Sequence, residues 1–413
     1  MSRLIVIGWL SFMLLGCGQL LALKSDLKLA DELYEEITVS IDTPATQDKR
    51  YIVIQLSELD ADSILTVNAI DRGSEIKLPS FFKLTNYIFV FEDENLDFTY
   101  QINEPSYLYD KNNVINNHIT ISDAYMTTVG LAQLADLAVL PLLELKLKPE
   151  LVGNITTWDD PAFSDAAKAM GMWQPMQFIQ EDYVGIFFLA PYDKHKIPVL
   201  YVHGMGGSGK DFQKLIAQLD TNKYQAWVVN YPSALSLTLL SQSIAGMMTL
   251  LQDQYHYKPV HIVAHSMGGV LTQRYLNVCN IGARCGLIRS FTSIASPFGG
   301  VASAESGVER SPVVMPAWRD IAPNSPSIKN LFTPTVSDSL PPHLLLFTYR
   351  QDNFEMGASS DGTIALSSQL TPLAQQQAQT IYGFNYGHID VLDAADVFNT
   401  IQIFWSKIEL KSH

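Results

Sequence analysis

The period of the hydrophobic pattern changes along the chain. In residues 24–123, short runs rich in β-branched and aromatic residues are separated by turn residues, and apolar and polar positions alternate in Y-I-V-I-Q-L and D-F-T-Y-Q-I. A period of two places the apolar side chains on one face of a strand. We therefore expect a small β-sandwich over residues 17–123. Its strands are predicted at 36–41, 50–57, 64–70, 87–92 and 97–104.

A helical pattern follows in residues 124–175. Its run V-G-L-A-Q-L-A-D-L-A-V-L-P-L-L-E-L is strongly apolar, but Asp136, Pro141 and Glu144 interrupt it. Charges and a helix-breaking proline oppose a helix that spans a bilayer. We expect a buried helical connector between two domains.

Strands alternate with helical segments from residue 176 to residue 413. This alternation predicts an α/β domain whose mostly parallel sheet is covered by helices on both faces. In such a sheet, the functional residues usually lie at the carboxyl ends of the strands. Strands are predicted at 197–203, 224–231, 260–264, 287–295, 343–349 and 380–384, and helices at 211–219, at 237–254, up to about 277 and from 389 onward.

The predicted strand at 260–264 ends in A-H-S-M-G-G, where small residues surround one serine. Ala264 lies two positions before Ser266, and Gly268 and Gly269 follow it closely. Small residues remove side chains where the backbone turns sharply from strand to helix, a geometry that lifts a hydroxyl above the sheet. Ser266 is therefore the candidate nucleophile, and a structural turn serine is the alternative.

Three other segments at predicted strand ends carry possible partners for this serine. H-G-M-G-G-S-G, which starts at His203, leaves backbone N–H groups uncovered for an oxyanion, and its glycine spacing does not fit a phosphate loop. S-S-D-G-T-I contains Asp361, and Y-G-H-I-D contains His388. The order Ser, Asp, His is the one that this fold class uses for a catalytic triad.

Each candidate has an alternative. Asp352 and Asp390 are the other possible acids, and capping of the last helix is the other possible role of His388. His203 and His265 are expected to orient the motif loops. No cluster of Cys, His and carboxylate has the spacing of a metal site, and we expect neither a metal nor a cofactor.

Residues 176–413 resemble the lipase and esterase branch of the α/β-hydrolase superfamily. A-H-S-M-G-G resembles the nucleophile elbow of small bacterial lipases, H-G-M-G-G their oxyanion loop, and S-I-A-S-P-F-G-G their segment after the nucleophile helix. The resemblance implies a carboxylic-ester hydrolase that forms an acyl-enzyme with an ester or lipid substrate. It implies Ser266, Asp361 and His388 as the triad, and the backbone amides of Met205 and Met267 as oxyanion donors.

The triad does not fix what accepts the acyl group. An acyltransferase or an amidase would use the same three residues. Outside the enzymes, the alternative is a surface-binding lipoprotein whose hydrolase domain has lost its activity.

The chain of 413 residues is strongly anionic. Its formal net charge is −15, and residues 24–123, with 8 basic and 19 acidic side chains, contribute −11 of it. Because nucleic-acid phosphate would be repelled, we expect no nucleic-acid partner. The acidic β region contains no catalytic constellation, which leaves it as a spacer, a surface-binding module or a structural partner. The oligomeric state stays open.

Residues 1–16 have the pattern of a bacterial lipoprotein signal peptide. A basic start precedes the apolar run 4–15, which is too short to span a bilayer. The following L-L-G-C resembles a lipobox, which implies a lipid anchor on Cys17 and a location in the cell envelope, at the outer membrane or the periplasmic face. An ordinary signal peptide is the alternative. Use of Cys17 as the anchor leaves Cys279 and Cys285 as an even pair, for which we expect a disulfide rather than two free thiols.

A long insertion, residues 298–342, separates two predicted strands. It exceeds the usual length of an α/β connection, and long loops in compact domains are often lids or binding loops. Four prolines between positions 312 and 326 oppose one continuous helix, so we expect short helical turns. We expect the insertion to cap Ser266 and to form an acyl-chain site lined by Trp318. The alternative is a brace between the two domains.

Overall fold

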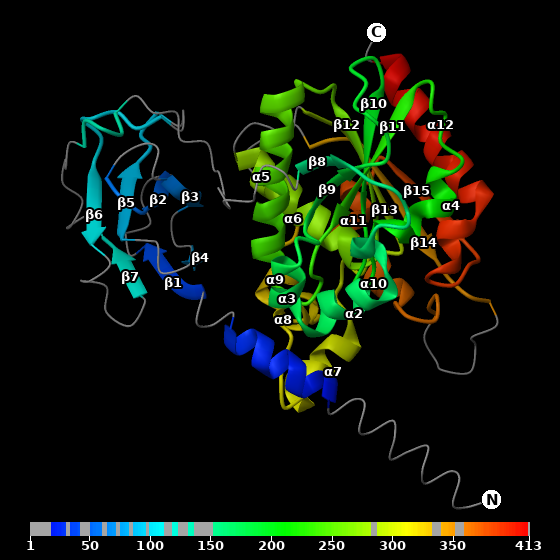
Figure 1. Ribbon diagram of the computed structural model, residues 1–413, viewed down its shortest axis with the longest axis horizontal. Helices are drawn as coiled ribbons and strands as arrows, with labels where there is room; N and C mark the ends of the chain where they lie inside the picture. Colours follow the sequence, from blue (N-terminus) through cyan, green and yellow to red (C-terminus); the bar gives the residue numbers. More distant parts are fainter. Residues whose placement is uncertain are drawn as a thin grey trace, which may run out of the picture.

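The computed structural model describes most of the chain, in two folded units (Figure 1). A β unit lies within residues 34–122, and an α/β domain lies mainly within residues 152–411. Cys17, Asp352, Cys285 and the side chain of Cys279 lie outside the described residues, as does the predicted signal peptide. The described ranges are 18–29, 34–41, 50–59, 64–71, 75–81, 86–95, 99–110, 118–122, 131–135, 152–281, 287–332, 340–351 and 359–411.

The β unit is a sandwich of two sheets, as the alternating pattern predicts. The first sheet has the order β4-β1-β7, and the second has the order β3-β2-β5-β6. Alternate residues of β1, β2, β5 and β7, such as Val39, Val53 and Val90, form one buried cluster. The strands are β1 (Tyr34–Ile41), β2 (Arg50–Leu56), β3 (Ile64–Asp71), β4 (Glu75–Phe81), β5 (Tyr87–Glu92), β6 (Ser106–Asp110) and β7 (His118–Ile121).

The prediction of a strand at 97–104 is wrong in its described part, residues 99–104. The Glu104 carboxylate accepts the backbone N–H groups of Gln101 at 2.9 Å and Glu94 at 3.1 Å, which closes a turn where an extended strand was expected. The strand forms later, as β6, and pairs with β5. Further along, Leu134 packs on the outer face of the second sheet, and residues 131–135 form a turn rather than the expected helix.

The α/β domain is built on one sheet with the order β15-β14-β13-β12-β10-β11-β9-β8. Its neighbouring strands run parallel, except that β9 is antiparallel to β11. The mostly parallel sheet is thus confirmed. The strands are β8 (Val152–Ile155), β9 (Gly185–Phe188), β10 (Ile197–Val202), β11 (Tyr224–Asn230), β12 (Val260–His265), β13 (Ile288–Ile294), β14 (His343–Thr348) and β15 (Thr380–Phe384).

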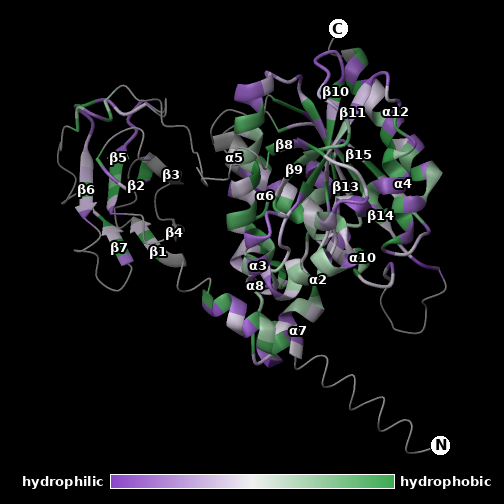
Figure 2. Ribbon diagram, in the orientation of Figure 1, coloured by the Kyte–Doolittle hydropathy of each residue, from purple (hydrophilic) through white to green (hydrophobic). Residues whose placement is uncertain are grey.

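Helices cover both faces of this sheet (Figure 1). Helices α5 (Leu237–Tyr255) and α6 (Met267–Ile281) pack on one face, and α4 (Gln213–Ile216) and α12 (Ala395–Lys411) pack on the other. The central strands are mostly apolar, as Figure 2 shows, because each of them is buried on both sides.

The sheet begins before the predicted domain boundary at residue 176. Strand β8 pairs with β9, and helices α2 (Asp165–Trp173) and α3 (Pro175–Gln180) connect these two strands. Part of the expected connector, residues 124–175, therefore belongs to the α/β domain. Four-residue strands such as V-G-N-I give too short a pattern to be recognised from the sequence.

Residues 18–29 form a helix that packs on the α/β domain, although the sequence places them in the β region. Leu23 is fully buried against Ala234 and Met315. The Asp26 carboxylate accepts the N–H groups of Met176 at 2.7 Å and Gln177 at 3.1 Å, at the start of α3. The β unit is thus inserted between this helix and the rest of the α/β domain. Within the described residues, no helix is long and apolar enough to cross a bilayer.

The insertion at 298–342 forms short helices, as expected, and we call its described part, residues 298–332, the cap. The helices are α7 (Ala302–Arg310), α8 (Pro316–Ile321) and α9 (Pro326–Lys329), and α8 and α9 each begin with a proline. Met315 and Ile321 are buried, so the apolar residues of the cap pack into the α/β core and against helix 18–29.

Candidate active site

Ser266 lies on a sharp turn between β12 and α6. Its φ of 55° is in the left-handed region, and its N–H donates to the Ile294 carbonyl at 2.9 Å. A side chain at Gly268 would clash with the carbonyl oxygens of Val202 and His203, and one at Gly269 would clash with Ser296. The flanking glycines are therefore required for β10, β13 and α6 to approach the serine this closely.

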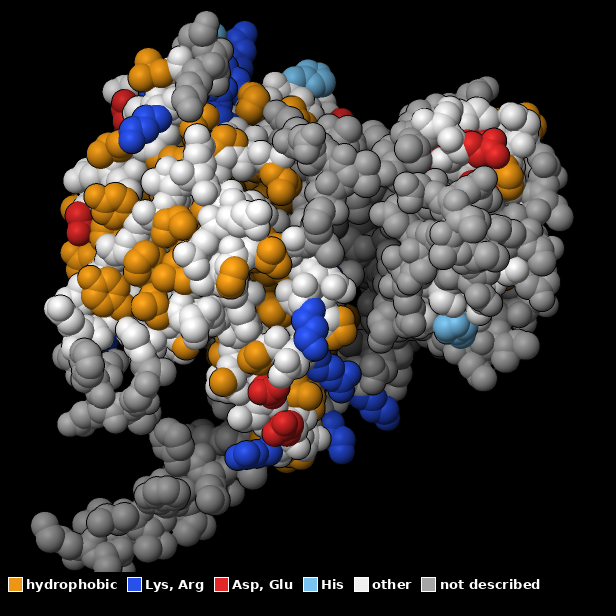
Figure 3. Space-filling view, turned by 180° about the vertical axis from the view of Figure 1, so that it is seen from behind, with side chains coloured by type: hydrophobic (Ala, Val, Ile, Leu, Met, Phe, Trp, Pro, Cys, Tyr) orange, Lys and Arg blue, Asp and Glu red, His pale blue; other side chains and the backbone are white. Residues whose placement is uncertain are grey.

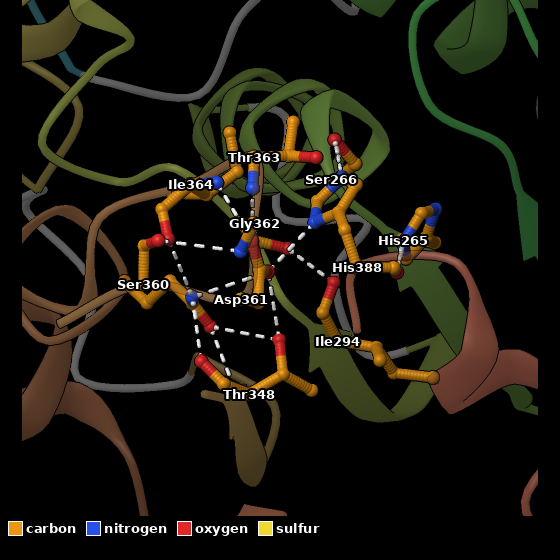
Figure 4. A network of polar contacts seen from close by, with 12 residues as sticks. His265, Ser266, Ile294, Thr348, Ser360, Asp361, Gly362, Thr363, Ile364 and His388 are labelled. Carbon is orange, nitrogen blue, oxygen red and sulfur yellow. Dashed lines mark hydrogen bonds and ion pairs between the residues drawn. The ribbon is translucent and has the colours of Figure 1, made fainter. Parts of the chain in front are cut away.

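The three residues predicted as a triad meet at the carboxyl ends of three strands (Figure 4). His388 Nε2 lies 2.9 Å from Ser266 Oγ, and His388 Nδ1 lies 2.7 Å from Asp361 Oδ2. A carboxylate only accepts, so Nδ1 carries a hydrogen, and in the neutral imidazole Nε2 is free to accept the serine hydroxyl. Ser266 is partly exposed, whereas His388 and Asp361 are buried.

Asp361 is held as a charged acceptor. Gly362 has a φ of 95°, which turns the backbone so that the N–H groups of Thr363 and Ile364 donate to Asp361 Oδ1 at 2.9 and 2.7 Å. Burial alone would raise the pKa of this carboxyl. Hydrogen bonds and charge at His388, together with the donors at Ile364 and Thr348, bring the pKa below its ordinary value.

Two backbone donors are free beside the serine. The N–H groups of Met205 and Met267 find no acceptor among the described residues, whereas the N–H of Gly206 already donates to Ser233 Oγ at 2.9 Å. Gly204 lies so close that a side chain there would come within 2.9 Å of Ser266 Cβ. The two amides predicted as oxyanion donors are thus left unpaired next to the turn at Ser266.

Several solved structures resemble part of this chain. A mature lipase of Bacillus licheniformis, BlEst2, is 15% identical with a TM-score of 0.43, over 53% of this chain and 97% of its own. Lipase B of Aspergillus fumigatus is 18% identical with a TM-score of 0.38, over 50% of this chain and 52% of its own. The metagenomic carboxyl esterase MGS0156 is 12% identical with a TM-score of 0.40, over 53% of this chain and 77% of its own. No curated protein matches the chain significantly.

The family model described as the alpha/beta hydrolase family matches residues 199–399. This range starts within β10 and extends past β15, and it contains the turn at Ser266, Asp361 and His388. The domain has the α/β-hydrolase fold. We call it the hydrolase domain below, for its fold alone.

Thr348 and Gln369 complete the surroundings of Asp361 in the hydrolase domain, and no sequence motif points to either residue. Thr348 Oγ1 donates to Asp361 Oδ2 at 2.8 Å, and Gln369 Nε2 lies 3.3 Å from the same oxygen. The Gln369 amide also pairs with the Thr348 backbone, accepting its N–H at 2.8 Å and donating to its carbonyl at 3.0 Å. Gln369 thus fixes the end of β14, where Thr348 reaches the acid.

Two buried histidines hold the loops of the site, as expected. Burial lowers the pKa of His203 to about 4 and that of His265 to about 3, so both rings are neutral. His203 stacks on Tyr231 at 4.0 Å and donates from Nδ1 to the Gly204 carbonyl at 2.8 Å. His265 Nε2 donates to the His388 carbonyl at 2.8 Å, which fixes the loop of His388.

The remaining candidates lie further from this network. Asp390 pairs with Arg350 at 3.3 Å, whereas Asp361 reaches His388, and Asp352 lies outside the described residues. Trp318 lies in α8, where it packs on Gly307 and joins the cluster around Leu23. Its part in substrate binding stays a prediction. Among the described residues, no group of three or more Cys, His, Asp and Glu side chains could hold a metal ion.

Proposed function

We propose that this protein is a membrane-anchored serine carboxylic-ester hydrolase of lipase or esterase type, acting through an acyl-enzyme on Ser266. One observation carries the proposal. An unbroken hydrogen-bond chain joins Ser266 Oγ to His388 and then to Asp361, and it begins at a serine with a strained, left-handed backbone.

The geometry supports acylation by general-base catalysis. As Ser266 Oγ attacks the ester carbonyl carbon, its proton moves to His388 Nε2, and the buried Asp361 carboxylate stabilises the resulting imidazolium. The tetrahedral intermediate then collapses, its C–O bond to the alcohol breaks, and the alcohol leaves with the proton from His388.

Deacylation repeats the same steps with water. His388 Nε2 takes a proton from water, whose oxygen attacks the acyl carbon, and the acid is released as the proton returns to Ser266 Oγ. In both tetrahedral intermediates the oxyanion lies between the free N–H groups of Met205 and Met267. One such donor typically contributes about 2.7–4 kcal/mol to lowering the barrier.

The anchor is a separate part of the proposal. It rests on the lipobox-like L-L-G-C, which would place a lipid on Cys17 and the protein on a membrane of the cell envelope. An ester or lipid at that membrane is the proposed substrate.

Fluorophosphonate labelling of the full-length protein tests the nucleophile, because the reagent phosphonylates an activated serine. We expect Ser266→Ala to lose both labelling and ester hydrolysis. The matched control is Ser303→Ala, which alters an exposed serine of α7 and should behave as wild type. Undiminished labelling of Ser266→Ala would refute the assignment. Absence of labelling in the wild-type protein would favour the alternative of a binding protein without activity.

A further inference from the structure

The cap and helix 18–29 together present a basic surface on an acidic protein. Helix 18–29 exposes two lysines, and the cap helices expose two arginines and a lysine. In these described helices, Glu309 is the exposed acidic residue. Figure 3 shows lysine and arginine side chains, with acidic side chains among them, at the lower end of the hydrolase domain. We call this surface the basic face; it consists of Lys24, Lys28, Arg310, Arg319 and Lys329.

Helix 18–29 is fixed on the cap in a way that turns its positive charges outward. Leu23 is buried against Met315, and Leu27 packs in the same cluster. The acid of this helix, Asp26, points inward and is used by two backbone N–H groups of α3. The Asp26 carboxylate therefore lies at the N-terminus of α3 and not on the outer side of helix 18–29. The outer side carries the two lysines.

The basic face is connected to the catalytic side of the hydrolase domain. In α8, the N–H of Ala317 donates to the Ala234 carbonyl at 3.0 Å. The neighbouring Ser233 accepts the N–H of Gly206, in the loop that carries the free Met205 amide. Only a few residues therefore separate the basic face from the oxyanion loop.

We propose that the basic face docks on an anionic lipid bilayer and holds the catalytic side of the domain toward it. This inference rests on the proposed function, in which a lipid on Cys17 enters the membrane one residue before helix 18–29. A lipid on Cys17 would hold the chain at the membrane without fixing which face of the domain meets it, and a basic patch adds electrostatic binding to anionic lipids. The substrate class is then an ester lipid of the membrane that carries the anchor.

Charge and position favour a bilayer over other anionic partners. The whole chain carries −15, so a long polyanion that reaches beyond the basic face would be repelled. A flat bilayer next to the anchor would meet the basic face first. Leu21 of helix 18–29, which is 67% exposed, adds an apolar contact of the kind that interfacial helices insert between lipids.

Vesicle flotation of the full-length protein with Cys17→Ser tests the basic face without the proposed lipid. The vesicles contain phosphatidylcholine alone or with one-third phosphatidylglycerol. The basic-face variant is Arg310→Gln, Arg319→Gln and Lys329→Gln. The control carries the same change of charge at exposed lysines remote from the cap, as Lys194→Gln, Lys258→Gln and Lys407→Gln.

A basic side chain near an anionic surface typically strengthens binding about fivefold. We therefore expect the basic-face variant to bind anionic vesicles at least about tenfold more weakly than the control. Binding to neutral vesicles should not differ, and high salt should remove the difference on anionic vesicles. Equal losses in both triple variants, or equal binding of the parent protein to both kinds of vesicle, would overturn the proposal. The proposal would also be overturned if the parent protein bound double-stranded DNA more tightly than it bound anionic vesicles.

Hydrolysis of a soluble short-chain ester separates this proposal from the proposed function. We expect the basic-face variant to retain wild-type activity on that ester, because its changes lie outside the triad. A protein that binds anionic vesicles through the basic face but hydrolyses no ester would support the docking surface and refute the hydrolase. Hydrolysis without charge-dependent binding would do the reverse.

Discussion

Ser266 adopts a backbone conformation that serine rarely takes. Its φ of 55° is tolerated because the next strand accepts its N–H and because the neighbouring residues are small. The strain serves the position of the hydroxyl, which is partly exposed and 2.9 Å from His388 Nε2. The local sequence could predict this turn, because the close packing around Ser266 requires small residues on both sides of it.

The predicted role of Asp361 as the acid of the triad can be tested by replacing its carboxylate with a neutral amide. We expect Asp361→Asn to lower kcat by roughly 10⁴-fold, because the amide would favour the wrong tautomer of His388. Asp352→Asn should change kcat little. Steady-state kinetics on one soluble ester gives the ranking, and a larger loss for Asp352→Asn would transfer the role to that residue.

The contacts of Thr348 and Gln369 predict a positioning role for the Thr348 hydroxyl. Thr348→Val keeps the shape of the side chain but removes the donor to Asp361 Oδ2, so we expect kcat to fall by about 10-fold with KM nearly unchanged. Thr348→Ser keeps the hydroxyl and should restore kcat. If valine and serine behave alike, or if only KM changes, the hydroxyl has no such role.

At the scale of elements, predictions succeeded where periodicity was sustained and failed where structure depends on distant contacts. The long strands and helices from β10 onward follow from alternating buried segments. Helix 18–29 could not be assigned to the hydrolase domain, because Leu23 and Asp26 find their partners more than a hundred residues away. Gln369 was missed for the same reason, since its role depends on the end of β14.

The cap leads to a prediction about how activity depends on the acyl-chain length of the ester substrate. Trp318 packs on Gly307 and lies between the hydrolase core and the Leu23 cluster. If the cap forms the acyl-chain site, Trp318→Ala should lower kcat/KM on long-chain esters about 10-fold more than on acetate esters, because apolar contact area is lost only for the long chain. An equal loss on both substrates would leave Trp318 as a packing residue of the cap.

At the scale of the whole molecule, the hydrolase domain has a second polar network at the amino end of its sheet, apart from the one around Ser266. Glu409 of α12 lies 3.4 Å from His261 Nε2, accepts the Tyr224 hydroxyl at 2.8 Å and pairs with Lys223. His261 is fully buried and stacks on Trp405. This network joins the last helix to β11 and β12, so it couples the end of the chain to the centre of the sheet.

Glu409 makes the stability of this connection depend on pH. Burial alone would raise the pKa of Glu409, but hydrogen bonds from His261, Lys223 and Tyr224 lower it from the ordinary 4.5 to about 2. A depressed pKa in the folded protein means that the charged form stabilises the fold. This contribution is fully present above pH 4.5 and is lost as the pH falls toward 2.

We therefore expect Glu409→Gln to lower the free energy of unfolding by about 2 kcal/mol at pH 7, the usual contribution of a hydrogen bond to a charged group. The difference from wild type should shrink between pH 4.5 and pH 2. Urea unfolding followed by tryptophan fluorescence measures it, because Trp405 lies beside His261. Glu309→Gln, at an exposed position of α7, should match wild type throughout. A difference between Glu409→Gln and wild type that stays constant down to pH 2.5 would show that Glu409 acts through its shape and not through its charge.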